Sequence, residues 1–318
     1  MKYRDWLNEW LELYVKPSVK PKTFSNYAAA ARLYIHPRLG NLEMKELDGL
    51  TLQRFVISLF ENGNVRTGGG LAAASVAQIA ALVERSLLQA AKTGQTTGYV
   101  EEVVKPRTQE STFDVKCFTV NEQKAIEDRI LQKSDGTLYG ILITLYTGLR
   151  VGELLALTWE DIDLTRGFLS VSKTCRDEWK GGYKKIIGTP KTPSSYRLIP
   201  IPRQLMPYLR KLKKTSKSEY VISGKNNLIS VRSYQRTFER LLKKLKIPHR
   251  GFHALRHTFA TRAIENNVDI KTLSEVMGHK SPTVTLTIYA HSLAPHKRSM
   301  MNKLGRLLTG TFNDEPEE

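Results

Sequence analysis

Apolar residues in the first hundred positions recur at helical spacing, and Trp6, Trp10 and Tyr14 lie on one such stripe. An alanine-rich run further along carries another apolar stripe of the same period. Prolines and glycines interrupt these runs, as they do at helix ends. The pattern predicts four helices, at about residues 6–14, 23–33, 52–61 and 73–92, and the second of them is expected to end before His36 and Pro37.

The pattern changes after residue 104, where a polar segment with Pro106 and no period is typical of a linker. Thr119, three residues before Glu122, then predicts a capping box at the start of a helix. A run with leucine and isoleucine at helical spacing follows, and Gly148 predicts its end.

Alternating apolar residues predict two strands, at 168–172 and 196–201. The second strand is expected to be one arm of a hairpin over 186–201, with the turn at 189–193. Helical patterns return from about Val231 onward.

These patterns predict a mainly α, multidomain fold whose second domain carries a small antiparallel sheet. A chain of 318 residues is long enough to bury two cores. The expected divisions are a helical domain over 1–104, a linker over 105–117, a second domain over 118–294 and a tail over 295–318.

The positive charge of the chain is concentrated in one segment. The formal net charge is +18, and residues 173–262 alone hold 23 Lys and Arg against 4 Asp and Glu. A field concentrated in this way favours a polyanion such as the phosphate backbone of a nucleic acid. A solvated basic surface that aids solubility is the alternative interpretation.

Other classes of protein are disfavoured by what the sequence lacks. No run of 18 apolar residues predicts a membrane span, and the N-terminal residues have no signal-peptide core. Two cysteines, Cys117 and Cys175, make neither a disulfide framework nor a four-cysteine zinc site. We expect a cytoplasmic, nucleoid-associated protein with no metal and no cofactor.

Arginine and histidine recur in short motifs in the second domain. Arg150 and Glu153 are three residues apart, as are His253 and Arg256, so each pair shares one helix face. Arginine matches phosphate oxygens with its planar fork, and histidine can move a proton near neutral pH. Taken alone, the Arg150–Glu153 spacing is more typical of a surface ion pair.

His279 follows Gly278, which predicts a helix end, and Ser281 and Pro282 predict the start of the next helix. Tyr289 lies ten residues after His279. Tyrosine can form covalent intermediates, although most of the 13 tyrosines are expected to be structural. His257 is interpreted as a packed, hydrogen-bonded side chain, because the helical turn directs it away from Arg256.

The order and the local sequences of these motifs closely resemble those of the tyrosine recombinases, the integrases of phages and mobile elements. The resemblance covers nearly the whole chain. It implies that residues 1–104 are a SAM-like core-binding domain and that residues 118–294 are the catalytic domain. It also implies the roles of six catalytic residues and of Glu153, which orients the site; the six are Arg150, Lys191, His253, Arg256, His279 and Tyr289.

In the family, a lysine in a hairpin turn protonates the departing 5′ oxygen, and Lys191 stands in the matching pattern. Lys184 and Lys185 lie nearby and remain alternatives for this role. The resemblance also includes proteins with an arm-site-binding domain in front of the core-binding domain. Since the core-binding pattern starts at residue 1, that domain is expected to be lacking or to have been removed.

The resemblance implies an enzyme that cleaves and rejoins DNA through a 3′-phosphotyrosine and a Holliday junction, without ATP or metal. The implied partners are double-stranded recombination sites, three further copies of the chain, and accessory DNA-bending or excision factors. A type IB topoisomerase, which shares the pocket, and a DNA-binding regulator without catalysis are the alternatives. The tail carries Met300, Met301, Leu304 and Leu307 at helical spacing, and it is expected to dock either on a neighbouring copy or on its own domain.

Overall fold

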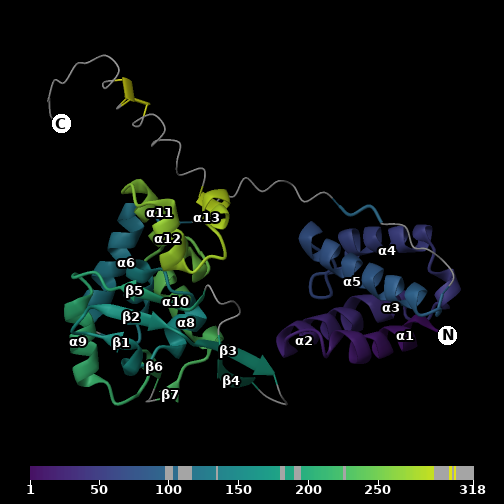
Figure 1. The fold of residues 1–318 in the computed structure, drawn as a ribbon, viewed down its shortest axis with the longest axis horizontal. Helices are drawn as coiled ribbons and strands as arrows, with labels where there is room; N and C mark the ends of the chain where they lie inside the picture. The colour runs from purple at the N-terminus through teal and green to yellow at the C-terminus, as the bar shows by residue number, and fades with distance from the viewer. Residues whose placement is uncertain are drawn as a thin grey trace. The chain divides into compact units, whose positions relative to one another are not determined.

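The computed structural model divides the chain into two compact units, Met1–Ser111 and Thr112–Glu318, each with its own core (Figure 1). The two units are described separately. The structure describes residues 1–96, 103–106, 117–133, 135–179, 183–189, 195–224, 227–289, 301–302 and 304–305.

The regular secondary structure in the described residues of unit 1 is helical, apart from one isolated bridge between Lys2 and Glu43. Helices α1 (Tyr3–Trp10) and α2 (Pro21–Ala30) each continue into a π-helical turn, at Leu11–Val15 and Ala31–Ile35. Asp48 caps α4, because its carboxylate accepts a hydrogen bond from the backbone N–H of Thr51 at 2.7 Å. The helices are α1 (Tyr3–Trp10), α2 (Pro21–Ala30), α3 (His36–Leu39), α4 (Gly49–Asn62) and α5 (Ala73–Lys92), with a 3-10 turn at Met44–Glu46.

The core of unit 1 joins α1 to α5. The apolar stripe predicted for α5 is buried, with Val76, Val83 and Leu87 at most 2% exposed. Ser86 on the same face bonds two aromatic residues of α1: the Tyr3 hydroxyl at 2.6 Å and, through its carbonyl, the Trp6 indole N–H at 3.0 Å. Buried aromatic polar atoms therefore find partners inside the core.

The sequence predicted the extent of α5 correctly, from residue 73 to residue 92. The predicted end of the second helix before His36 and Pro37 is wrong, because the π-helical turn leads directly into α3. Pro37 lies in the first turn of α3, the part of a helix that accommodates proline best.

Unit 2 combines helices with three small sheets. Its helices are α6 (Val120–Lys133), α7 (Tyr139–Thr147), α8 (Val151–Ala156), α9 (Met206–Thr215), α10 (Val231–Lys244), α11 (His253–Glu265), α12 (Ile270–Met277) and α13 (Pro282–Tyr289). A 3-10 turn covers Trp159–Asp161. The strands are β1 (Ile162–Asp163), β2 (Phe168–Val171), β3 (Thr174–Trp179), β4 (Tyr183–Gly188), β5 (Arg197–Pro200), β6 (Ser223–Gly224) and β7 (Asn227–Leu228).

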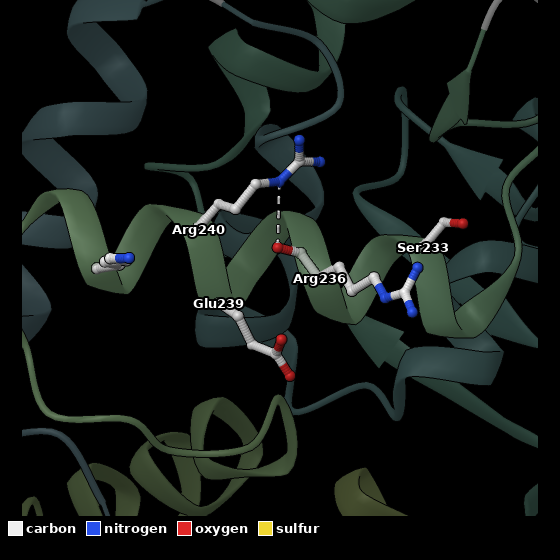
Figure 2. Close-up of a pocket in the computed structure, with 5 residues that line it drawn as sticks. Ser233, Arg236, Glu239 and Arg240 are labelled. Carbon is white, nitrogen blue, oxygen red and sulfur yellow. Dashed lines mark hydrogen bonds between the residues drawn. The ribbon is translucent and has the colours of Figure 1, made fainter.

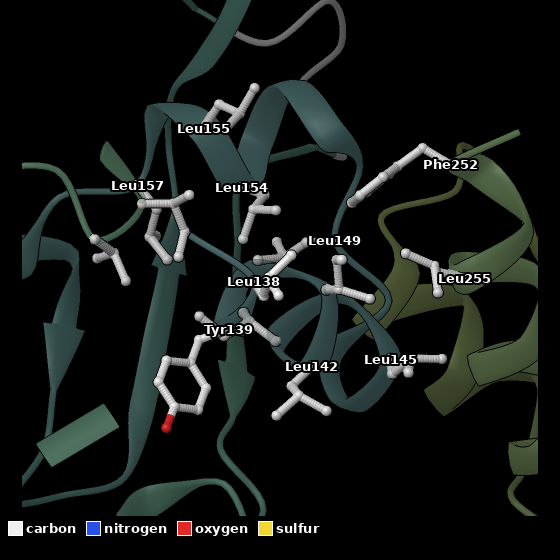
Figure 3. Packing of buried hydrophobic residues seen from close by; sticks show 14 of the residues in the cluster. Leu138, Tyr139, Leu142, Leu145, Leu149, Leu154, Leu155, Leu157, Phe252 and Leu255 are labelled. Carbon is white, nitrogen blue, oxygen red and sulfur yellow. The ribbon is translucent and has the colours of Figure 1, made fainter. Parts of the chain in front are cut away.

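Helix α7 lies at the centre of unit 2 and is buried on all sides, which explains why its sequence is apolar rather than amphipathic. Leucines of α7 and α8 pack with Phe252 and Leu255, which belong to the start of α11 (Figure 3). The predicted capping box of α6 is present: Thr119 and Glu122 exchange hydrogen bonds of 2.9 and 3.2 Å. The core thus fixes α7, α8 and α11 against one another.

The sheets correct one prediction. Segments 168–172 and 196–201 do form strands, β2 and β5, but β5 pairs with β2 and not with the segment before it. Strand β4 instead pairs with β3, so the predicted hairpin over 186–201 is wrong. Alternation identifies the faces of a strand but not its partner, and β3 and β4 are an extra hairpin between the paired strands β2 and β5.

The β3–β4 hairpin is attached to the start of α10. Asp177 of β3 accepts hydrogen bonds from the backbone N–H groups of Val231 and Arg232, at 3.2 and 3.1 Å. Lys185 of β4 donates to the carbonyl of Leu228 at 2.7 Å. An acid from another element therefore satisfies the free N–H groups at the helix start.

The predicted tail falls largely outside the described residues. Met300 and Leu307 are among those that the structure does not describe, whereas Met301 and Leu304 are described and are 58% and 45% exposed. Whether the tail docks in cis or in trans stays a prediction.

Gly148 ends α7 with a left-handed backbone, at φ 67°, as the sequence predicted. A Cβ at this position would lie 2.6 Å from Cδ1 of the Phe259 ring on α11. Gly167 has nearly the same backbone, at φ 74°, but nothing lies within 4 Å of its Cβ position. The two glycines therefore separate backbone strain from close packing.

Gly148→Ala should destabilise unit 2 by roughly 2–5 kcal/mol, combining left-handed strain with overpacking. Gly167→Ala should cost about 1–2 kcal/mol, from strain alone. Hydrogen exchange of peptides from α7 and α11 measures the opening free energy of unit 2 separately from unit 1. Equal losses in the two variants would show that the contact with Phe259 does not matter.

Candidate active site

The C-terminal end of α12 is the point at which most of the candidate residues meet. Gly278 adopts the left-handed conformation at φ 63° that closes the helix, as predicted. The backbone N–H groups of Gly278 and His279 return to the carbonyls of Glu275 and Ser274, both at 3.0 Å. This closure satisfies two carbonyls of the last turn and leaves the next three, at 276–278, for other donors.

Each of these three carbonyls accepts a hydrogen bond from a different arginine. The arginines come from β5, α11 and the start of α8, and they are called the arginine cluster below. Positive groups are favoured at a helix C-terminus, where the carbonyl dipoles concentrate negative potential. The bonds are Arg197 Nε to Val276 O at 2.6 Å, Arg256 Nη2 to Met277 O at 2.5 Å and Arg150 Nη2 to Gly278 O at 3.1 Å.

Arg150 is the most exposed member of the arginine cluster. It is the residue before the first turn of α8, and its side chain is 36% exposed. Its Nη1 donates to Oε1 of Glu153 at 2.7 Å, and its backbone N–H donates to Oε2 at 3.0 Å. The predicted i,i+3 pair therefore exists, and Glu153 holds both the side chain and the backbone of Arg150.

Arg256 is buried, with 1% of its surface exposed. Its Nη1 donates to the carbonyl of Gly148 at 2.7 Å, and its Nη2 donates to Met277 as above. Arg256 therefore joins the turn that follows α7 to the turn that follows α12. Its guanidinium is engaged by main-chain atoms of both turns.

Glu153 is a buried acid between two arginines. It is 4% exposed, and Arg197 donates to both of its oxygens, Nη2 to Oε2 at 2.9 Å and Nη1 to Oε1 at 3.3 Å. Burial acts to raise the pKa of Glu153, but hydrogen bonds and charge from Arg197 and then charge from Arg150 lower it to about 2. Glu153 is therefore a carboxylate at any pH near neutrality.

Sequence reasoning missed Arg197. Its side chain is 6% exposed, and it shares the inward face of β5 with Ile199. A usable signal existed: the alternation predicted for 196–201 places Arg197 on the same side as Ile199 and Ile201. An arginine on a buried face requires a buried acceptor, and this requirement points to an acid such as Glu153.

His279 is half-buried directly after the Gly278 turn. Its Nδ1 lies 2.7 Å from the hydroxyl of Thr285, which is fully buried on α13. Burial, followed by the charges of Arg256, Arg150, Arg197 and His253, lowers the pKa of His279 to about 3. The ring is therefore neutral at pH 7 and is fixed through one nitrogen.

His253 begins α11 and is exposed, as its place at the helix start allows. Loss of hydration, followed by His257 and then the charges of Arg256 and Arg150, lowers the pKa of His253 to about 4. The ring of His257 packs edge-on against that of His253, with centroids 4.6 Å apart, so this histidine lies beside a candidate site residue. An i,i+4 spacing places the two rings on one helix face.

Two predicted residues cannot be placed in full. Lys191 lies outside the described residues. The backbone of Tyr289 ends α13, one helical turn after Thr285, but its side chain is not described. Of the alternatives to Lys191, Lys184 is exposed on β4 and Lys185 bonds the carbonyl of Leu228.

Basic side chains line the exposed face of α10. A pocket on this face is lined by Arg236, Glu239, Arg240 and Lys243, and Figure 2 shows the first three as sticks along the helix. The opposite face buries Tyr234 and Phe238 in the core. The charge excess found in the sequence therefore emerges on a helix surface, where it can meet a polyanion.

In the described parts of the chain, no helix is both long and apolar enough to cross a membrane. Within the same residues, no three histidine, cysteine or acidic side chains gather closely enough to hold a metal ion.

Family models match both parts of the chain. Residues 111–296 match the model of the phage integrase family, and residues 2–60 match the phage integrase N-terminal SAM-like domain. The chain belongs to the phage integrase family. The predictions of family and fold class are thereby confirmed, including a SAM-like helical domain ahead of the catalytic domain.

Curated relatives are named as recombinases, integrases and transposases. The XerC-like tyrosine recombinase of Caldanaerobacter subterraneus subsp. tengcongensis is 29% identical, and the match covers 95% of this chain and 82% of that protein. The ICEBs1 integrase of Bacillus subtilis is 28% identical over 57% of this chain and 50% of its own length. The Tn916 transposase of Enterococcus faecalis is 30% identical over 52% and 45%.

Solved structures share the fold. The Tn1549 transposon integrase, in complex with transposon right-end DNA, superimposes with a TM-score of 0.77 at 23% identity, covering 96% of this chain and all of that one. A lambda integrase tetramer bound to a Holliday junction gives 0.67 at 22% identity, covering 89% and 79%. At such identities the likeness shows the fold alone. The family models and curated relatives show the class of enzyme, a tyrosine site-specific recombinase.

The DNA-free protein should keep the His279 ring neutral well below pH 6. The pKa of His279 is about 3 in the folded protein and 6.5 in the unfolded chain, so on acidification the unfolded chain takes up this proton at a higher pH. The free energy of unfolding is therefore unaffected by His279 above pH 6.5. Below that pH it falls by up to about 1.4 kcal/mol per pH unit. Ring NMR signals followed from pH 8 to 4.5 provide the measurement, with urea-unfolded protein as the reference; a midpoint near 6.5 in the folded state would contradict the assignment.

Proposed function

We propose that Arg150 and the rest of the arginine cluster hold a scissile DNA phosphate while Tyr289 attacks its phosphorus. The observation that carries this proposal is the junction at the end of α12. There, three guanidinium groups and His279 surround one helix terminus, and Thr285 bonds His279 one turn before Tyr289. A phosphodiester, a proton donor and the nucleophile would meet at that junction.

The charge balance of the junction suits an anion that gains charge in the transition state. Three arginines stand against one carboxylate, Glu153, so the cluster carries two net positive charges. Fixed positive groups that face developing charge lower the barrier, because they need no reorganisation during the reaction. Arg150, whose side chain is the most accessible of the three, would contact the phosphate, and buried Arg256 would add positive charge from the interior.

The neutral histidines fit hydrogen-bonding and proton-accepting roles. When the Thr285 hydroxyl donates to Nδ1 of His279, the ring carries its proton on Nε2 and can donate it to a phosphate oxygen. His253 is exposed and, with its pKa lowered to about 4, is uncharged at neutral pH. It can accept the proton of the Tyr289 hydroxyl as the phenolic oxygen attacks.

The chemistry balances without ATP. The bond from the Tyr289 oxygen to phosphorus forms, the bond from phosphorus to the 5′ oxygen breaks, and Lys191 gives that oxygen its proton. The 3′-phosphotyrosine retains the energy of the phosphodiester. A 5′-hydroxyl from another strand then attacks the phosphorus. This attack rejoins the DNA and releases the Tyr289 oxygen.

The proposed substrate is a pair of double-stranded recombination sites in the cytoplasm, held by four copies of the chain. Support comes from the relatives: a lambda integrase tetramer is described on a Holliday junction, and the Tn1549 integrase is described with circular-intermediate DNA. Met301 and Leu304 in the tail are exposed and could pack on a neighbouring copy. Accessory DNA-bending or excision factors belong to the same proposal, as do the domain divisions 1–104, 105–117, 118–294 and 295–318.

Tyr289→Phe should abolish the covalent protein–DNA adduct, by at least about 1,000-fold, because phenylalanine has no oxygen to attack phosphorus. Half-site binding should change little. The assay uses a nicked suicide substrate in excess EDTA, read as a denaturant-stable band. Tyr208→Phe on α9, whose ring stacks on Tyr139, is the matched control and should retain the adduct; a full adduct from the Tyr289 variant would refute the nucleophile.

Lys191→Ala should slow cleavage by about 100-fold or more, within the range expected for loss of a general acid. The defect should largely vanish on DNA whose 5′ bridging oxygen is replaced by sulfur, since the thiolate leaves without a proton. Lys184→Ala and Lys185→Ala are the matched comparisons, expected to show no such substrate-dependent rescue. If one of them is rescued and Lys191→Ala is not, that lysine is the acid.

A further inference from the structure

Arg197 makes more contacts to the candidate site than its place in a strand suggests. From the first position of β5 it bonds both oxygens of Glu153, the carbonyl of Val276 and the carbonyl of Ser195. The four bonds measure 3.3, 2.9, 2.6 and 3.1 Å. A planar guanidinium with five N–H donors can satisfy all of these acceptors at once.

The contacts of Arg197 determine how Glu153 acts on Arg150. Glu153 Oε1 is shared by Nη1 of Arg150 and Nη1 of Arg197, and Oε2 is shared by the backbone N–H of Arg150 and Nη2 of Arg197. A carboxylate held from two sides cannot rotate without losing bonds. The direction of the Arg150 guanidinium is therefore fixed through Glu153 by a residue 44 positions away in the chain.

Arg197 also controls the charge that Arg150 presents. Without Arg197, the buried carboxylate of Glu153 would pair with Arg150 alone, and the two charges would cancel toward an incoming phosphate. With Arg197 present, the three groups together carry one net positive charge. Buried pairs are weakly screened by salt, so this difference is felt at the phosphate position.

The same side chain ties two further parts of the site together. Its bond to Val276 holds the last turn of α12, which ends in the Gly278 turn before His279. Its bond to Ser195 fixes the chain four residues after Lys191 in the sequence.

We propose that Arg197 is a positioning residue for strand cleavage: it orients Arg150 through Glu153 and keeps that arginine's charge available to the scissile phosphate. This inference rests on the proposed function, because it assumes that Arg150 contacts the phosphate.

A purely structural role would have different consequences. Removing one partner of a buried ion pair destabilises a fold in general, whatever the pair does. Arg262 on α11 is the control with the same kinds of bond in a more exposed place, because it also bonds one carboxylate, Glu265, and one carbonyl, that of Phe118. Loss of Arg262 measures the cost of removing such an arginine away from the α12 terminus.

The experiment compares single-turnover cleavage of a nicked suicide half-site with binding of the same DNA. Arg197→Gln should lower the cleavage rate by roughly 100-fold, the scale expected for misplacement of a reacting group, with half-site affinity changed by less than about 5-fold. Arg197→Lys keeps the positive charge but loses the planar guanidinium, so its cleavage rate should lie between those of Arg197→Gln and the wild type. Arg262→Gln should cleave within about 3-fold of the wild type.

A double-mutant cycle separates action through Glu153 from general damage. Glu153→Gln combined with Arg197→Gln should cleave about as slowly as the slower single variant. A double variant whose defect equals the product of the two single defects would overturn the proposal, because the residues would then act independently.

The pH profile gives a reading that a structural role would not change. In the wild type Glu153 stays ionised far into acid. Loss of the Arg197 fork removes the main group that opposes burial, so the pKa of Glu153 rises and cleavage should fall earlier on acidification. The groups around Glu153 that could also titrate or act on it are Arg150, Arg256, His253 and His279, together with Asp161 and Lys173, which line a small cavity beside it.

His253→Asn and His279→Asn, each combined with Arg197→Lys, identify any contribution of these histidines to the fall in cleavage rate at acidic pH. If Arg197→Gln does not fold, as judged by circular dichroism, the Lys variant decides the question alone. The proposal would be overturned if Arg197→Lys cleaved at the wild-type rate and its rate fell at the same acidic pH as that of the wild type. Absence of a Tyr289 adduct from the wild type would instead refute the proposed function, so the two failures can be told apart.

Discussion

The three free carbonyls at the end of α12 are the constraint on which the rest of the site depends. A helix that closes on a left-handed glycine leaves its final carbonyls without partners, and in a buried position each must find a donor. Here the donors are Arg197, Arg256 and Arg150, which come from three elements widely separated in the chain. Hydrogen bonds that involve a charged group contribute about 1.5–3 kcal/mol each, so the terminus holds α8, α11 and β5 together.

The same charges that suit a phosphate also contribute to the protonation state of the histidines. Burial first, and then the neighbouring positive charges, lower the pKa of His279 and His253, and both rings are neutral in the DNA-free protein. A bound phosphate brings negative charge to the same place and would raise both values. Phosphate binding and proton affinity are therefore linked, and a ring that is a weak base in the empty site becomes a better one once the substrate is present.

Much of the fold followed from periodicity, and the exceptions have physical reasons. The stripe on α5, the capping box of α6 and the glycine ends of α7 and α12 depend on neighbouring residues, so local sequence predicts them. The pairing of β5 with β2 depends on which strands come together across an intervening hairpin, which alternation does not encode.

For the site, the motifs named Arg150, Glu153, Arg256 and His279, and the structure brings them around one helix end. The sequence did not predict Arg197 as a site residue, because its partners are a side chain in α8 and two main-chain oxygens. Main-chain atoms carry no signature in a sequence. The sequence did not predict the burial of Arg256 for the same reason. An arginine motif indicates charge, but whether that charge faces solvent or a carbonyl depends on the turn it meets.

The use of main-chain acceptors has a consequence for how this site can vary among related sequences. Every residue offers the same carbonyl, so the side chains at Val276 and Met277 can drift within the limits of packing without altering what the arginines bind. Gly278 has no such freedom, since its backbone conformation closes the helix and exposes those oxygens. Sequence divergence at this terminus should therefore be wide at positions 276 and 277 and narrow at Gly278, although all three residues supply an acceptor carbonyl.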